Sequence, residues 1–110
     1  MDSQALDRVF GALSDPIRRG ILVCLSEGER NVSQLTEAFD VSQPAISRHL
    51  RLLLDAGLIK KEKRGREQFI HAEAEQAKRA AAWITHYSAF WRAHFDEVQD
   101  ILDSKREHQS

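Results

Sequence analysis

The sequence predicts a single, mainly α-helical domain with one small β-hairpin, and three observations indicate it. Apolar residues recur at i, i+3 and i+4 through most of the 110 residues, which is the spacing of amphipathic helices. Both prolines stand where a helix can begin, and residues 73–103 contain neither proline nor glycine. Two short segments, 58–63 and 68–71, flank a basic turn with one glycine and are the predicted strands.

Two helices are predicted at the start of the chain. The first ends near Ser14. The second begins after Asp15, which is a suitable N-cap for a helix with Pro16 at its first position, and it ends near Gly28. The expected apolar faces are Leu6, Val9, Phe10 and Leu13 in the first helix, and Ile17, Ile21, Cys24 and Leu25 in the second.

A third and a fourth helix are predicted on either side of a short turn, Asp40-Val41. We expect the third helix to begin at the cap Ser33. Ser42 caps the fourth helix, and Pro44 is tolerated in its first turn because the N–H groups there have no partner within the helix. Gly57 ends it. The expected core residues are Val32, Leu35 and Phe39, followed by Ile46, Leu50, Leu53 and Leu54.

The last helix is predicted over residues 73–103, with a frayed end over 105–110. Its apolar residues follow a heptad and form a broad face, which one small body cannot cover over roughly 45 Å of helix. A second copy of the chain is the simplest cover, with a wholly intramolecular core as the alternative. The predicted dimer interface consists of Leu6, Phe10, Ile84, Tyr87, Trp91, His94, Phe95, Val98 and Ile101.

Composition restricts the function. Hydrophobic residues make up 42% and charged residues 30%, which excludes a disordered chain. No apolar stretch suits a membrane helix and the N-terminal residues contain no secretory signal, so the expected compartment is the cytoplasm. The only cysteine, Cys24, lies on an apolar face and is expected to be a core residue and not a redox sensor. Phosphate-binding glycine loops and hydrolase motifs are missing, so we expect neither an enzyme nor a cofactor.

The charge is concentrated in the middle of the chain. Residues 48–66 carry a net charge of +5 and the rest −6, which favours phosphate binding, although a solvated hairpin is the alternative. On the fourth helix, Arg48 and Arg51 point away from the apolar stripe, and Gln43 and Ser47 lie on one flank. A helix that enters the major groove needs such small, hydrogen-bonding and cationic residues. Helix, turn, helix and charged hairpin form the order of a winged helix-turn-helix.

Three separated motifs resemble the ArsR/SmtB family of repressors, in that family's order. They are residues 10–18 (FGALSDPIR), residues 42–50 (SQPAISRHL) with Leu53 and 56–59 (AGLI), and the turn Arg64-Gly65-Arg66. The resemblance covers residues from about 6 to 72. The aromatic segments 83–87 (WITHY), 90–91 and 95–96 are similar to a subset of the family that lacks metal ligands and includes autorepressors.

The resemblance implies a homodimeric repressor that binds a near-palindromic operator in double-stranded DNA, with its core over 15–72 and its dimerisation helix over 73–103. It implies that Gln43, Ser47, Arg48 and His49 face the DNA, although His49 has an alternative as a hydrogen-bonding surface residue beside Leu52. With the helix cap, the exposed arginine and the wing, the predicted DNA-binding set is Ser42, Gln43, Ser47, Arg48, His49, Arg51, Lys63, Arg64 and Arg66.

Two further interpretations stay open. Some members of the family respond to metals, but residues 35–40 contain no cysteine, and Ala81-Ala82-Trp83 stands where Asp-x-His would be required. We therefore expect no metal, with a non-standard site at His86, His94 and Glu97 as one alternative. The other is a protein-interaction module that uses the apolar last helix and barely touches DNA. The effector is not predicted.

Overall fold

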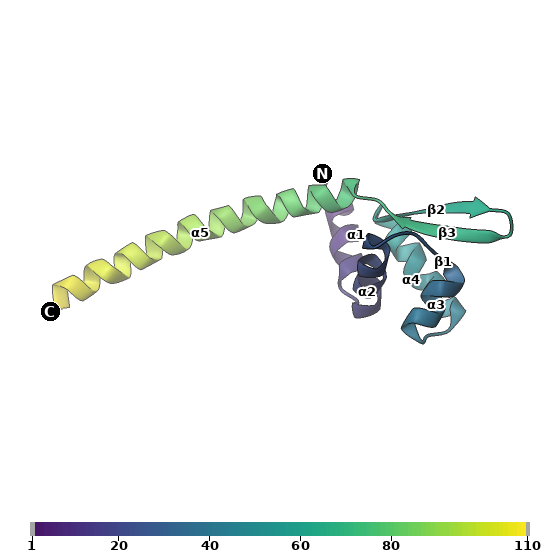
Figure 1. Ribbon diagram of the computed structural model, residues 1–110. Coiled ribbons are helices and arrows are strands. Elements are labelled where there is room, and N and C mark those ends of the chain that lie inside the picture. Colours follow the sequence, from purple (N-terminus) through teal and green to yellow (C-terminus); the bar gives the residue numbers. More distant parts are fainter. Residues whose placement is uncertain (1, 110) are drawn as a thin grey trace. The chain divides into compact units, whose positions relative to one another are not determined.

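The computed structural model describes residues 2–109, with their side chains except those of residues 91, 94, 95 and 106–109. Over these residues the order of elements is α1-α2-β1-α3-α4-β2-β3-α5 (Figure 1). The chain divides after Ala80 into two compact units: α1 to α4, the sheet and the start of α5 belong to the first, and the rest of α5 to the second. Within the described residues, no helix combines the length and the apolarity that crossing a membrane requires.

The first two helices confirm the predicted junction. α1 (Ser3–Leu13) ends before Ser14, and α2 (Pro16–Ser26) begins with its proline at the first position. The Asp15 carboxylate accepts hydrogen bonds from the backbone N–H groups of Ile17 and Arg18, at 2.8 and 3.1 Å. Cap and proline therefore fix the residue at which α2 begins.

The predicted cap of the third helix was wrong. α3 (Val32–Phe39) begins after Asn31 and not after Ser33. Asn31 Oδ1 accepts a hydrogen bond from the Gln34 N–H at 2.8 Å, and Gln34 Oε1 accepts one from the Asn31 N–H at 2.9 Å. This reciprocal capping box satisfies two backbone donors at once, which Ser33 alone could not do.

α4 (Gln43–Asp55) follows α3 after residues 40–42 and completes the predicted helix-turn-helix. Asp40 adopts the left-handed conformation, with φ of 49°, and so ends α3. Ser42 caps α4 as predicted, since its Oγ accepts a hydrogen bond from the Ala45 N–H at 3.2 Å. Gly57, with φ of 74°, follows the end of the helix.

A three-stranded antiparallel sheet forms beside these helices. The predicted hairpin is confirmed as β2 (Ile59–Arg64) and β3 (Glu67–Ala72), the two neighbouring arrows joined by a turn in Figure 1. A third strand, β1 (Arg30–Asn31), pairs with β3 and gives the order β1-β3-β2. It was not predicted, because two residues are too short to show an alternating pattern. The hairpin turns at Gly65, whose φ of 63° favours glycine.

The core of the first unit lies between the helices and the sheet. On α4, Ile46, Leu50 and Leu53 are fully buried, as predicted, and Leu54 is half-buried. Cys24 packs against the core, in agreement with its predicted structural role. The buried hydrophobic residues are Val9, Ala12, Ile21, Leu25, Leu35, Ile46, Leu50, Leu53, Ala56, Leu58, Ile59, Ile70 and Ala80.

α5 (Glu75–Gln109) is one continuous helix of 35 residues. It begins two residues later than predicted and continues past residue 103, so the expected frayed end is helical as far as Gln109. Trp91, His94 and Phe95 of the predicted interface lie outside the described side chains. Among the described side chains of α5, the exposed large apolar ones are Trp83, Ile84, Tyr87, Phe90, Val98, Ile101 and Leu102.

Candidate nucleic-acid interface

The N-terminal half of α4 has an exposed polar side. Its buried stripe holds the helix against the core, and the residues opposite that stripe are left in solvent. The structure thus brings five of the predicted DNA-binding residues to one exposed side of the helix. They are Ser42, Gln43, Ser47, Arg48 and Arg51.

The side chains of β2 and β3 alternate between two faces of the sheet. Because Ile59 and Ile70 are buried, residues in step with them lie on the same face. Lys61 pairs with Ile70, and Lys63 pairs with Gln68, so these three polar residues share the face turned toward the helices. Glu62, Arg64 and Phe69 lie on the opposite face. We call β2, β3 and the turn between them the wing.

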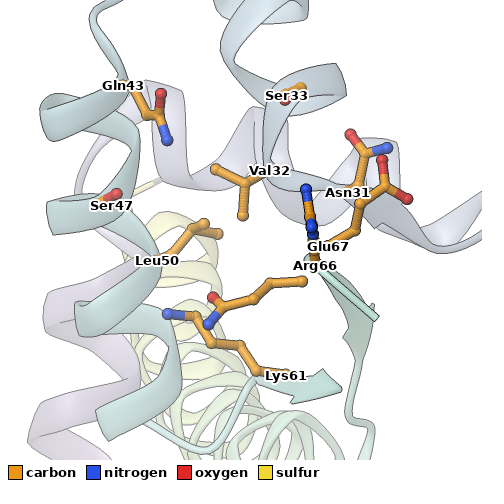
Figure 2. Close-up of a pocket in the computed structure, with 10 residues that line it drawn as sticks. Asn31, Val32, Ser33, Gln43, Ser47, Leu50, Lys61, Arg66 and Glu67 are labelled. Atoms are coloured by element: carbon orange, nitrogen blue, oxygen red, sulfur yellow. The ribbon is translucent and has the colours of Figure 1, made fainter. Parts of the chain in front are cut away.

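A groove of about 330 Å³ lies between α4, the start of α3 and the wing. Figure 2 shows Gln43 and Ser47 along one side of it and Arg66 on the other, with the Lys61 amine directed toward α4. Ser33 completes the polar lining at the top. Amide and hydroxyl groups thus share one concave surface with two cations, an arrangement that suits a phosphate backbone beside base edges.

Sequence reasoning missed five polar residues that line this α4–wing groove. They are Asn31, Ser33, Lys61, Glu67 and Gln68. Lys61 was counted in the basic stretch, but it was not assigned to the site. Strand alternation from the apolar Ile59 would have placed it on the inner face.

Arg64 is placed differently from the other predicted wing cations. Its two terminal nitrogens donate to both carboxylate oxygens of Glu29, at 2.6 and 2.9 Å, and one of them also donates to Glu62 at 2.8 Å. Its guanidinium carbon lies 4.6 Å from the centre of the Phe69 ring. The two carboxylates raise the pKa of Arg64, and its hydrogen bonds lower the pKa of Glu29 and of Glu62. Arg64 thus has two carboxylate partners within the chain, and its predicted contact with DNA stays a prediction.

His49 also has partners within the chain. Its Nδ1 lies 3.2 Å from Arg18 Nη1 and accepts a hydrogen bond, because a guanidinium can only donate. The same nitrogen is 3.9 Å from the Asp15 carboxylate, and the His49 side chain is only 17% exposed. Arg18 Nε donates in turn to the carbonyl of Ala12 near the end of α1, at 2.8 Å. Arg18 is therefore the hydrogen-bond partner of His49, and both roles that were considered for His49 stay predictions.

No group of three His, Cys, Asp or Glu side chains suited to a metal ion occurs among the described residues. His86 is exposed on α5, whereas His94 of the alternative metal site lies outside the described side chains. The metal interpretation of His86, His94 and Glu97 therefore stays untested.

Comparison with known proteins decides the family. Residues 15–61 match the family described as "Bacterial regulatory protein, arsR family". The arsenical resistance operon repressor of Escherichia coli (strain K12) is 38% identical over 97 residues, which cover 86% of this chain and 80% of that repressor. The chain belongs to the arsR family.

Solved structures of arsR-family proteins have the same fold. An ArsR-like transcriptional regulator from Rhodococcus sp. RHA1 is 32% identical, with a TM-score of 0.81 over 92% of this chain and 93% of its own. The homodimeric winged helix-turn-helix DNA-binding domain of a possible ArsR-family regulator from Mycobacterium bovis is 26% identical, with a TM-score of 0.65 over 83% and 84%. These arsR relatives are transcriptional regulators and not enzymes. The sequence matches confirm the predicted family, and the structural match confirms the predicted fold.

Proposed function

We propose that this arsR-family chain is a homodimeric transcriptional repressor that binds operator DNA. The observation that carries the proposal is the α4–wing groove, with Gln43 and Ser47 on one side and Lys61 and Arg66 on the other. Short hydrogen-bonding side chains suit base edges, and cations suit phosphates. The similarity to the Escherichia coli arsenical resistance operon repressor supports repression as the outcome of binding.

The two parts of the interface have different roles in this proposal. The N-terminal half of α4 enters the major groove, where Gln43 and Ser47 face base edges and Arg48 and Arg51 contact phosphates. Ser42 places the N-terminal amides of α4 near a phosphate. On the wing, Lys63 and Arg66 follow the backbone or enter the adjacent minor groove, and Lys61 adds a cation inside the groove. Residues 15–72 thus carry DNA recognition.

A second copy of the chain covers the apolar side of α5. Phe90 is 61% and Ile101 is 56% exposed in a single chain, and such a row of large apolar side chains is unfavourable in water. The homodimeric Mycobacterium bovis domain supports this arrangement. A two-fold axis would present two α4 helices to successive major grooves, so we expect a near-palindromic operator with half-sites about 34 Å apart. Because the proposed operator is in chromosomal DNA, we expect the protein to act in the cytoplasm.

The direct test measures binding to the DNA upstream of the chain's own gene. Fluorescence anisotropy should show a complex with one dimer per site that is tighter than the complex with random DNA of equal length, and both should weaken steeply as salt rises. Equal affinity for the two DNAs would leave only a non-specific binder. No binding to either at low salt would favour the protein-interaction module.

A further inference from the structure

Arg64 joins three segments of the first unit at the end of β2. It binds Glu29, which lies between α2 and β1, and Glu62, which is two residues earlier on its own strand. The guanidinium also lies over the Phe69 ring of β3. Glu29 lies in the segment that joins α2 to β1, so its bond connects the wing to the helical body where α2 ends, 35 residues earlier in the sequence.

Backbone pairing alone supports the wing weakly. β1 pairs with β3 only at Ile70 and Phe69, so the part of the hairpin near the Gly65 turn has just two strands. A hairpin of two strands is at best marginally stable in water. The long Arg64 side chain starts in this two-stranded part and reaches back over Phe69 to Glu29, so it supports the region that β1 leaves unpaired.

The Arg64 network differs from an ordinary surface ion pair. Isolated pairs between exposed side chains contribute little, since they are screened and restrict flexible side chains. Here the bond to Glu29 is bidentate, and the same guanidinium also binds the carboxylate of Glu62. The Phe69 ring restricts the guanidinium from one side. Bidentate geometry and shared networks are the conditions under which exposed pairs do hold a structure.

We propose that Arg64 is a positioning residue for DNA binding: it holds the wing against the helical body so that Lys63 and Arg66 meet the DNA backbone. The inference rests on the proposed function. Arg64 lies on the sheet face opposite Lys61 and Lys63, and its charge is already compensated by two carboxylates. A phosphate would have to displace these carboxylates before it could bind the guanidinium.

Removing the Glu29 carboxylate separates positioning from contact, because the two roles predict opposite signs. If Arg64 contacts phosphate, Glu29→Gln frees the arginine and removes a nearby negative charge, so DNA binding should tighten. If Arg64 positions the wing, the same change loosens the hairpin, and affinity should fall about threefold to tenfold in spite of the lost negative charge. Glu27→Gln is the matched control and should leave affinity almost unchanged, since the one ion pair of Glu27 among the described residues is a 3.8 Å contact with Arg30.

Amide hydrogen exchange of residues 61–69 in the free protein tests the clamp without DNA. Glu29→Gln and Arg64→Ala should each speed exchange in this segment, and Glu27→Gln should not.

Each outcome decides the inference. Tighter DNA binding by Glu29→Gln, or unchanged exchange in the wing of Glu29→Gln and Arg64→Ala, would overturn it. If the unmutated chain does not bind DNA, the proposed function fails, whereas the exchange measurement still decides whether Arg64 holds the wing.

Discussion

Arg64 and Arg66 are two residues apart, yet they have different surroundings. Arg64 is bound by Glu29 and Glu62, whereas Arg66 is exposed and lines the α4–wing groove. Among the described residues, no carboxylate forms an ion pair with Arg66, so a phosphate can approach its guanidinium directly. We therefore expect Arg66 and its lysine neighbours to provide the electrostatic attraction of the wing for DNA.

Base reading and phosphate anchoring can be separated at single residues. Gln43 is short and exposed at the start of α4, so Gln43→Ala should weaken operator binding by about 1–3 kcal/mol and random-DNA binding much less. Arg66→Ala should weaken binding to both DNAs alike and flatten the salt dependence by about one unit. Titrations of both variants against both DNAs at several salt concentrations measure this. Equal losses on both DNAs for Gln43→Ala would contradict its role in base reading.

The environment of single residues was the part that sequence predicted least. The exposed polar side of α4 follows from helical spacing, because its apolar stripe is visible in the sequence. The partners of Arg64 and His49 do not follow from any spacing, since Glu29 and Arg18 are 35 and 31 residues away from them. Only the folded chain brings these residues together.

At the scale of elements, glycine fixes two turns, one after α4 and one between β2 and β3. Gly57 and Gly65 both have positive φ, 74° and 63°. A Cβ on Gly57 would lie 2.7 Å from Gln76 Cγ, whereas a Cβ on Gly65 would meet nothing within 4 Å. The two positions therefore share a backbone requirement and differ in space.

This difference gives a matched pair of substitutions. Gly65→Ala should lower the free energy of unfolding by roughly 1–2 kcal/mol, the cost of a left-handed L-residue. Gly57→Ala should lower the free energy of unfolding by the same amount and by about 1–3 kcal/mol more, because the added Cβ crowds Gln76. Urea unfolding of both variants measures the difference. If the two losses are equal, the contact between residue 57 and Gln76 has no energetic consequence.

Element boundaries could be predicted where one residue defines them. Asp15-Pro16 and Ser42 set the starts of α2 and α4, because caps act through local hydrogen bonds. Asn31 was overlooked because the capping signal extends to Gln34, and Ser33 lies between them. β1 exists only through its pairing with β3, which no local pattern of two residues can reveal.

For the whole molecule, carboxylates on the first unit predict a sensitivity to acid. Their folded pKa values lie below the unfolded ones, so their stabilisation is complete above the ordinary carboxyl value of about 4 and is lost as pH falls through the folded values. The backbone N–H of Arg18 lowers the pKa of Asp15. The side-chain hydrogen bonds of Arg64 lower the pKa of Glu29 and of Glu62, and the hydrogen bond of Lys60 lowers the pKa of Glu73.

Thermal unfolding at pH 7, 5, 4 and 3 measures this sensitivity. The midpoint should change little between pH 7 and 5 and then fall steeply below about pH 4. The double variant Glu29→Gln with Glu62→Gln should start lower at pH 7 and decline less, because two of the titrating carboxylates are gone. A double variant that declines as steeply as the unmutated chain would remove the Arg64 network from this explanation.

Zinc should not control DNA binding by this chain. Residues 35–40 in the third helix contain no cysteine. Ala81-Ala82-Trp83 stands where the family's other metal site would require Asp-x-His. We expect the same operator affinity with zinc, with cadmium and with a chelator, measured by anisotropy. A reproducible loss of binding with one equivalent of zinc would contradict this and favour ligands at His86, His94 and Glu97.

If the dimer forms through the apolar side of α5, a charged substitution should disrupt it on that side of the helix and on no other side. Ile84 and Ile101 are 46% and 56% exposed in a single chain and occupy a and d positions of the predicted heptad, whereas Ala89 lies on the opposite side of the helix. Ile84→Asp or Ile101→Asp should therefore give a monomer in light scattering at micromolar concentration, because a carboxylate would be buried without a partner. Ala89→Asp carries the same charge and should remain dimeric. The monomeric variants should also lose operator affinity, since a single α4 reads only one half-site. If all three variants stay dimeric, another surface joins the two copies, and an unmutated chain that is itself monomeric would remove the basis for a near-palindromic operator.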